Sequence, residues 1–151
     1  MPPLVDLKRL LSASNQISLG SIENNQVKEL LDAGSGSLGG ARPKASITDG
    51  GRLLLAKFSH PGDEWDVMAW EKTSLDVARA VGLAVPVARL LRIGSDSVLL
   101  LERFDREGSL LNGPRIPYLS AMSLVGARDG SQCDYADVAD ALICRSFCQE
   151  A

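Results

Sequence analysis

The sequence predicts an α+β domain: an antiparallel sheet, one long helix packed on it, and short flanking helices. Two pairs of apolar segments, each joined by a glycine-containing turn, predict four strands. A long amphipathic segment lies between the two pairs and predicts the helix. The chain has 151 residues, of which 45% are hydrophobic and 23% charged, a balance typical of one folded domain.

Composition and charge restrict the function classes. The formal net charge of −3 and the pI near 5.1 argue against direct nucleic-acid binding, which needs a positively charged surface. No apolar run approaches the roughly 20 residues of a membrane span, and the start, Met1-Pro2-Pro3-Leu4, does not resemble a signal peptide. We therefore expect a cytoplasmic protein without membrane contact. Its three cysteines are expected to be reduced, and no metal site is expected.

The N-terminal part is expected to be helical. Leucines recur at a spacing of three to four over residues 4–11, which predicts a short amphipathic helix. A second helix is expected to begin at Ser21, whose hydroxyl can cap the first turn, and to end at Gly34. Residues 1–33 would then form a helical linker.

Two hairpins are expected. Strands over residues 43–48 and 52–58 are joined by Asp49-Gly50-Gly51, a sequence typical of a tight turn. Strands over residues 85–93 and 98–104 flank Gly94-Ser95-Asp96 in the same way.

The helix between the hairpins is expected over residues 63–81, which makes the order β–β–α–β–β. At helical spacing it presents one set of side chains on one side: Val67, Trp70, Ser74, Val77 and Val81. Weaker helical patterns cover residues 120–125 and 134–148.

A glycine-rich segment precedes the first hairpin. Gly34-Ser35-Gly36-Ser37-Leu38-Gly39 matches G-x-G-x-x-G, a pattern of dinucleotide-binding folds and of protein kinases. The dinucleotide fingerprint needs a strand before the glycines and a helix after them, which is the reverse of the order here. A Walker loop needs G-K-[ST], whereas this chain has Pro43-Lys44-Ala45. A loop over phosphates followed by a lysine-bearing strand, with Lys57, resembles a kinase N-lobe.

A lysine that holds phosphates needs a carboxylate partner. Glu71 on the following helix can supply it, and Glu64 is the alternative. The competing interpretation is structural, since glycine-rich turns often precede hairpins and a lysine at a strand end is usually a solvated edge residue.

Several short motifs resemble the HipA-like family of bacterial serine/threonine kinases. They occur in family order between about residues 30 and 127, and the most diagnostic is Glu102-Arg103-Phe104-Asp105-Arg106. The others are Gly36-Ser37-Leu38-Gly39-Gly40-Ala41-Arg42-Pro43-Lys44, Lys57-Phe58 and Trp70-Glu71. Members of this family act as toxins that a small DNA-binding antitoxin restrains.

The resemblance implies a site for ATP with Mg²⁺. Lys57 would contact the phosphates as a catalytic residue, with Glu71 behind it. The backbone from Glu102 to Phe104 would contact adenine as the hinge between two lobes. Ser37 would be the autophosphorylated serine, whose added charge would repel ATP. The phosphates would be covered by the glycine loop, of which the nucleotide-binding residues are Gly36, Ser37, Leu38, Gly39, Gly40 and Ala41.

The resemblance also has a limit. A kinase needs a catalytic aspartate with an asparagine several residues further along the chain. Asn112 is the last asparagine of this sequence, so none of the four aspartates that follow Asn112 has an asparagine after it. We therefore expect residues 34–106 to be the kinase-like N-lobe and residues 107–151 the start of a truncated second lobe. ATP binding would be weak or absent, and the chain alone inactive. The alternative is a non-catalytic interaction module for an antitoxin, a separate catalytic chain or a second copy of itself.

Overall fold

The computed structural model describes residues 2–19, 42–109, 112–128 and 130–148. The helix expected from Ser21 and the glycine loop therefore lie outside the described residues. The chain divides into two compact units, Met1–Ile116 and Pro117–Ala151. Among the helices of the described ranges, none is long and apolar enough to cross a membrane.

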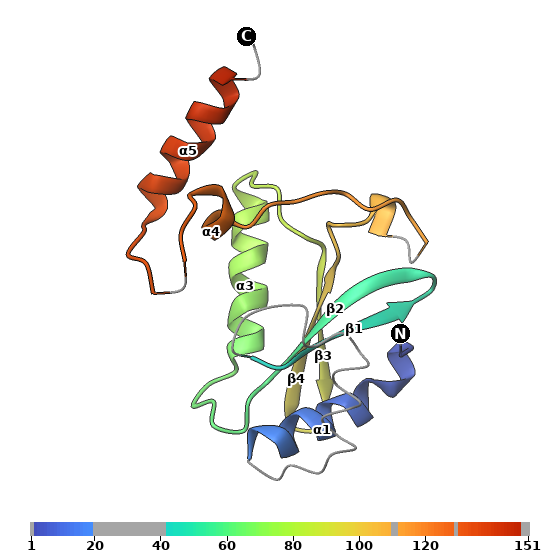
Figure 1. Ribbon diagram of the computed structural model, residues 1–151. Coiled ribbons are helices and arrows are strands. Elements are labelled where there is room, and N and C mark those ends of the chain that lie inside the picture. The colour runs from blue at the N-terminus through green and yellow to red at the C-terminus, as the bar shows by residue number, and fades with distance from the viewer. Residues whose placement is uncertain (1, 20–41, 110–111, 129, 149–151) are drawn as a thin grey trace. The chain divides into compact units, whose positions relative to one another are not determined.

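The first unit is built on one four-stranded antiparallel sheet (Figure 1). Its strands are β1 (Lys44–Asp49), β2 (Arg52–Phe58), β3 (Ala88–Ile93) and β4 (Asp96–Glu102), in the spatial order β1-β2-β4-β3. The two hairpins pair through β2 and β4, which forms a single sheet. The predicted α+β class and the β–β–α–β–β order are confirmed.

Glycines set the register of both hairpins. Gly50 and Gly51 have φ values of 55° and 80°, so both central positions of the first turn are left-handed, as a type I′ turn requires. With a two-residue turn the register is fixed, and Lys44 lies opposite Lys57. Gly94, at φ 63°, turns β3 into β4.

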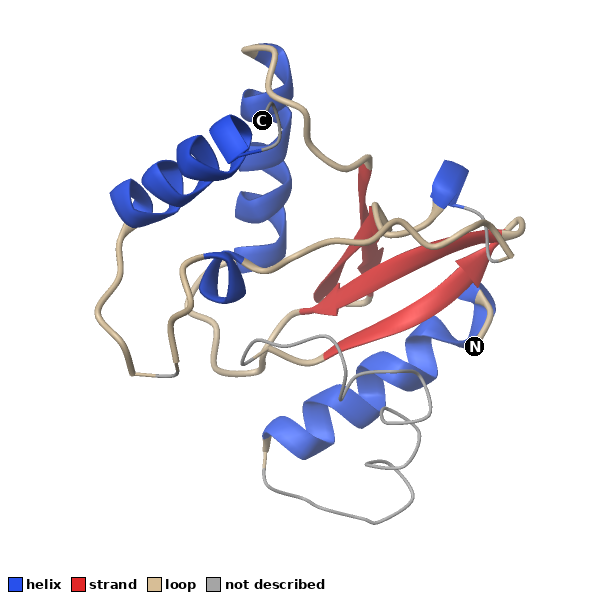
Figure 2. Cartoon of the chain, turned by 45° about the horizontal axis from the view of Figure 1, so that its top comes forward, coloured by secondary structure: helices blue, strands red, loops and turns tan. Residues whose placement is uncertain are grey.

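One face of the sheet is covered by α1 (Leu7–Ser18), which follows a short 3-10 turn, η1 (Leu4–Asp6). The helix runs further than the predicted residues 4–11 and lies along the β1–β2 hairpin (Figures 1 and 2). Alternate residues of the strands meet its leucines, because successive side chains of a strand point to opposite faces. The resulting core includes Leu7, Leu10, Leu11, Ala45, Ile47, Leu54, Ala56, Phe58, Val98 and Leu100.

The opposite face is covered by α3 (Val67–Ala80), which packs on β3 and β4. The helix begins after Asp66, whose carboxylate accepts the N–H of Ala69 at 2.9 Å and caps the first turn. Met68 is fully buried against Leu99, with Leu75 packed beside them. The side chains that were expected on one side of this helix differ in their burial. Val67 packs against the core, whereas Trp70, Val77 and Val81 are exposed.

The remaining elements are short or lie in the second unit. A 3-10 turn, η3 (Glu107–Ser109), follows the sheet. The second unit contains α4 (Ala121–Leu124) and α5 (Tyr135–Cys148), close to the two predicted helical stretches.

Candidate functional site

An ion pair joins the sheet to α3. The ammonium Nζ of Lys57 on β2 lies 2.5 Å from the carboxylate Oε1 of Glu71. About a quarter of the Lys57 side chain and a third of the Glu71 side chain remain exposed, at 26% and 31%. Both side chains are therefore partly open to solvent.

Helical spacing explains why Glu71 makes this contact. Met68, Glu71 and Leu75 are three and four residues apart, which places them on one side of α3. Met68 and Leu75 pack on the sheet, so Glu71 faces the sheet as well. Glu64, the alternative partner, is exposed and precedes the helix.

Two further basic residues lie at the start of β1. Arg42 donates to both carboxylate oxygens of Asp63, at 2.7 Å and 2.5 Å. This contact, with the hydrogen bond from the His60 N–H, holds the pKa of Asp63 below its usual value despite partial burial. Lys44 is 7% exposed, and its pKa is lowered by burial and by the neighbouring Lys57 ammonium.

We call these five side chains, Arg42, Lys44, Lys57, Asp63 and Glu71, the Lys57 cluster. The charge of Glu71 also raises the pKa of Arg42, after the larger effects of Asp63 and of burial. Three of the five side chains are cationic and two are anionic, so the cluster has a net positive charge. A net positive cluster with partly exposed members favours an anionic ligand.

The predicted hinge lies at the end of β4. Lys57 pairs with Leu99, so Glu102 stands three residues further along the strand, about 10 Å away. A nucleoside can span that distance. The Glu102 side chain forms an ion pair with Arg52 at 2.5 Å. By strand alternation this pair lies on the α1 face, opposite to Lys57, which leaves only the backbone of Glu102 for a ligand on the Lys57 face.

The residues after Glu102 are held by a charged contact. Arg103 donates to both carboxylate oxygens of Asp105, at 2.7 Å and 2.6 Å, and to the buried Ser46 hydroxyl at 2.9 Å. This network fixes the chain where it leaves the sheet, while Phe104 between the two paired residues is 62% exposed. An exposed aromatic ring at a fixed backbone position can contact a planar ligand.

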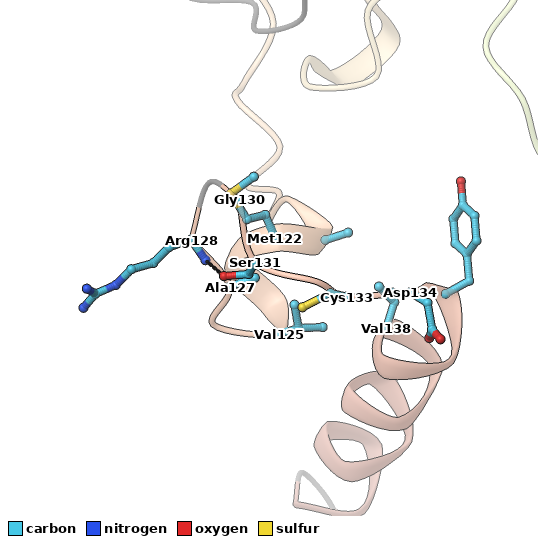
Figure 3. A pocket seen from close by; sticks show the side chains of 11 residues that line it. Met122, Val125, Ala127, Arg128, Gly130, Ser131, Cys133, Asp134 and Val138 are labelled. Atoms are coloured by element: carbon cyan, nitrogen blue, oxygen red, sulfur yellow. Dashed lines mark hydrogen bonds between the residues drawn. The ribbon is translucent and has the colours of Figure 1, made fainter.

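The second unit has a pocket of its own, of about 460 Å³, between α4, α5 and the intervening loop (Figure 3). Its lining is mostly apolar, with Met122, Val125 and Val138, and includes the exposed thiol of Cys133. The N–H of Arg128 donates to the Ser131 hydroxyl at 3.0 Å, and the Arg128 side chain points away from the pocket. The sequence analysis did not predict this pocket, because the residues that line it match no known motif.

The predicted site residues thus divide into three groups. Lys57 and Glu71 are in contact, and Glu102 and Phe104 lie at the end of the neighbouring strand. The glycine-loop residues, Gly36 to Ala41 with the phosphorylation candidate Ser37, lie outside the described residues and remain predictions.

The sequence analysis gave no role to Arg42 or Lys44, although one signal was available. The two-residue turn at Gly50-Gly51 fixes a register in which Lys44 must lie opposite Lys57.

Comparison with known proteins gives one match. The family described as HipA-like C-terminal domain matches residues 36–150. The match extends past residue 127, where the resemblance seen in the motifs ends, and includes the second unit. No curated protein matches the chain. No solved structure matches it either.

Proposed function

The chain belongs to the HipA-like family, and on this basis we propose that its first unit is the nucleotide-binding part of a serine/threonine kinase from a toxin–antitoxin pair. The observation that carries the proposal is the contact between Lys57 and Glu71. In kinases a strand-borne lysine holds the phosphates of ATP and is itself held by a glutamate from the adjacent helix.

The residues of the site fit a nucleotide. The Lys57 ammonium would bind the phosphates, and Glu71 would orient it. The net positive charge of the Lys57 cluster complements a polyphosphate. The backbone between Glu102 and Phe104 would bind the base, on the side of the sheet that carries Leu55 and Leu101. ATP supplies the phosphoryl group in this chemistry, and the chain's own residues position it.

We propose that the chain binds nucleotide without transferring phosphate by itself. Phosphoryl transfer needs an aspartate to orient the acceptor hydroxyl and further groups to hold Mg²⁺. The sequence after Asp105 offers no aspartate followed within several residues by an asparagine. Autophosphorylation of Ser37 would then require a complete kinase, and phosphopeptide mapping of such a parent enzyme tests it.

Thermal unfolding with added ATP tests the proposed function. A ligand that binds only the folded state raises the unfolding temperature, and the rise increases with ligand concentration. We expect such a rise for the wild-type chain at millimolar ATP and its loss in Lys57→Ala. Lys72→Ala is the matched control, because Lys72 has a similar side-chain exposure, 23% against 26%, and pairs with Asp76 on the same helix. Absence of a rise in the wild-type chain would contradict the proposal.

A second candidate function is that of a non-catalytic interaction module. It is favoured by an exposed apolar stripe on α3, where Trp70, Val77 and Val81 are 64%, 59% and 71% exposed. Such a stripe fits a protein partner, which by family context would be an antitoxin, a separate catalytic chain or a second copy of this chain. Sedimentation of the wild-type chain and of Val77→Asp tests the last case. Concentration-dependent association that the substitution abolishes would support this function, and a monomer at all concentrations would exclude the second copy.

A further inference from the structure

The sheet of the first unit has two edge strands, β1 and β3. At the β1 edge, the N–H of Thr48 donates to the carbonyl of Pro2 at 3.0 Å, so the N-terminal segment covers part of that strand. The β3 edge differs, because its outward backbone groups have no such cover among the described residues. An edge strand with open backbone groups is a template for pairing with another strand.

The hydrogen bonds between β3 and β4 show which groups of β3 face outward. The N–H of Glu102 donates to the carbonyl of Val87 at 2.9 Å, and bonded positions alternate along an antiparallel pair. In the register of the two strands, every second residue from Val87 onward therefore bonds to β4. The residues between them, Ala88, Leu90 and Arg92, direct their N–H and C=O groups to the outer edge. Within the described ranges, no hydrogen bond reaches these outward groups.

β3 is a regular strand whose charges are neutralised. Its six residues pair with β4 without a bulge, and none of the six is a proline or a lysine, the residues that often protect an edge. Both of its arginines have a carboxylate partner in the same unit. Arg89 lies 2.6 Å from Asp49, and Arg92 lies 2.9 Å from Asp66. The strand therefore has little net charge to repel a second strand.

The outward positions of β3 are complementary to those of a second copy. When two copies of β3 run antiparallel with Leu90 opposite Leu90, Ala88 of each copy lies opposite Arg92 of the other. All three outward residues then form hydrogen-bonded pairs. A shift by two residues in one direction would place Arg92 opposite Pro86, which has no N–H to donate. The register centred on Leu90 thus satisfies the most backbone groups.

The same register keeps like charges apart. Arg89 lies opposite Leu91 of the second copy, and Val87 lies opposite Ile93, in pairs without hydrogen bonds, where side chains approach most closely. Arg92 faces an alanine, so no cation lies directly opposite another cation. Val87 is 52% exposed in the single chain and gains an apolar neighbour. Side-chain pairing therefore favours a second copy at this edge.

We propose that β3 is a homodimerisation edge, at which two copies of this chain join their sheets antiparallel about Leu90. The two sheets would then form one continuous sheet. The proposed edge is a different surface from the exposed stripe on α3. It goes beyond nucleotide binding and does not depend on it, so a failure of either proposal leaves the other standing.

Sedimentation equilibrium of the whole chain with two matched variants tests the side-chain pairing. Leu91→Lys places a cation opposite Arg89 of the second copy, whereas Leu91→Glu places an anion there. Both variants lose the same contacts with the core beside α1. Each dimer has two such pairs, so we expect the dimer dissociation constant of Leu91→Lys to exceed that of Leu91→Glu by at least about fivefold. Equal constants for the two variants would overturn the inference.

Leu90→Pro tests the backbone pairing. The N–H of Leu90 faces the outer edge, so a proline there removes no hydrogen bond to β4 but blocks the centre of the proposed interface. We expect a monomer at concentrations at which the wild-type chain is a dimer. Val77→Asp on the α3 stripe is the control and should leave the dimer intact. A wild-type chain that stays monomeric at millimolar concentration, or a dimer that only Val77→Asp disrupts, would contradict the proposal.

Hydrogen exchange of the wild-type chain provides a test without any substitution. The amides of Ala88, Leu90 and Arg92 should exchange fast in the monomer and slow down as the protein concentration rises through the dimer dissociation constant. The amides of Arg89 and Leu91, which bond to β4, should exchange slowly at every concentration. Outward amides whose exchange does not slow in a dimer would show that the two copies associate elsewhere.

Discussion

The carboxylate of Asp66, which caps α3, accepts a hydrogen bond from the hydroxyl of Ser97 on β4 at 2.6 Å. Its other oxygen accepts the N–H of Ala69, and Arg92 lies 2.9 Å away. Burial raises the pKa of Asp66, but the two hydrogen bonds and Arg92 outweigh it and lower the pKa overall. The start of α3 is thereby tied to the sheet, which determines where Glu71 meets Lys57 on the next turn.

Replacement of Ser97 tests this attachment. Ser97 is 2% exposed, so Ser97→Ala leaves the partly buried Asp66 carboxylate, whose side chain is 27% exposed, with one hydrogen bond fewer. We expect the free energy of unfolding to fall by about 1–3 kcal/mol, measured by urea denaturation. Ser95→Ala, at an exposed position in the same hairpin, is the control and should change it by less than about 0.5 kcal/mol. Equal effects of the two substitutions would show that the contact contributes nothing.

The contact between Arg103 and Asp105 predicts a pH dependence. The hydrogen bonds from Arg103 hold the pKa of Asp105 below 3.8, its ordinary value. A carboxyl group with a lower pKa in the folded state stabilises the fold above its unfolded pKa, and this contribution is lost as the pH falls through the folded value. We therefore expect Asp105→Asn to be less stable than wild type at about pH 7, with the difference shrinking below about pH 4. Denaturation curves whose difference is constant with pH would contradict this.

The two sides of α3 should respond differently to truncation. Met68 is fully buried, so Met68→Ala should lower the free energy of unfolding by about 2–5 kcal/mol. Val77 is 59% exposed, so Val77→Ala should change it by less than about 0.5 kcal/mol. Thermal and urea denaturation measure the change in the free energy of unfolding for both variants. A large loss for Val77→Ala would mean that the exposed stripe is covered in solution.

The strands of the sheet could be predicted from the sequence because residues in and beside the turns determine where each hairpin forms. Gly50, Gly51 and Gly94 adopt positive φ values that other residues rarely do, and the flanking β-branched residues favour strands. The strand bounds therefore fell within about three residues of the observed ones. The start of α3 was predicted four residues early, because the cap at Asp66 depends on its contacts as well as on its residue type.

Other features depend on contacts between distant segments. Apolar periodicity marks candidate faces of a helix but cannot tell which face meets the sheet, as Trp70 and Val77 show. The choice of Glu71 over Glu64 follows from where α3 begins and how Met68 packs. The role of the glycine loop, including Ser37, rests on the resemblance alone, because that segment lies outside the described residues.

Titration of the isotope-labelled chain with ATP, followed by NMR chemical shifts, tests the central claim most directly. The account predicts that the largest changes occur at the Lys57 side chain and at the amides of β2 and α3 around Lys57 and Glu71. It also predicts smaller changes at Phe104 and little change along α1. Changes confined to α1 or to the second unit, or no change at millimolar ATP, would show that the Lys57 cluster does not bind a nucleotide.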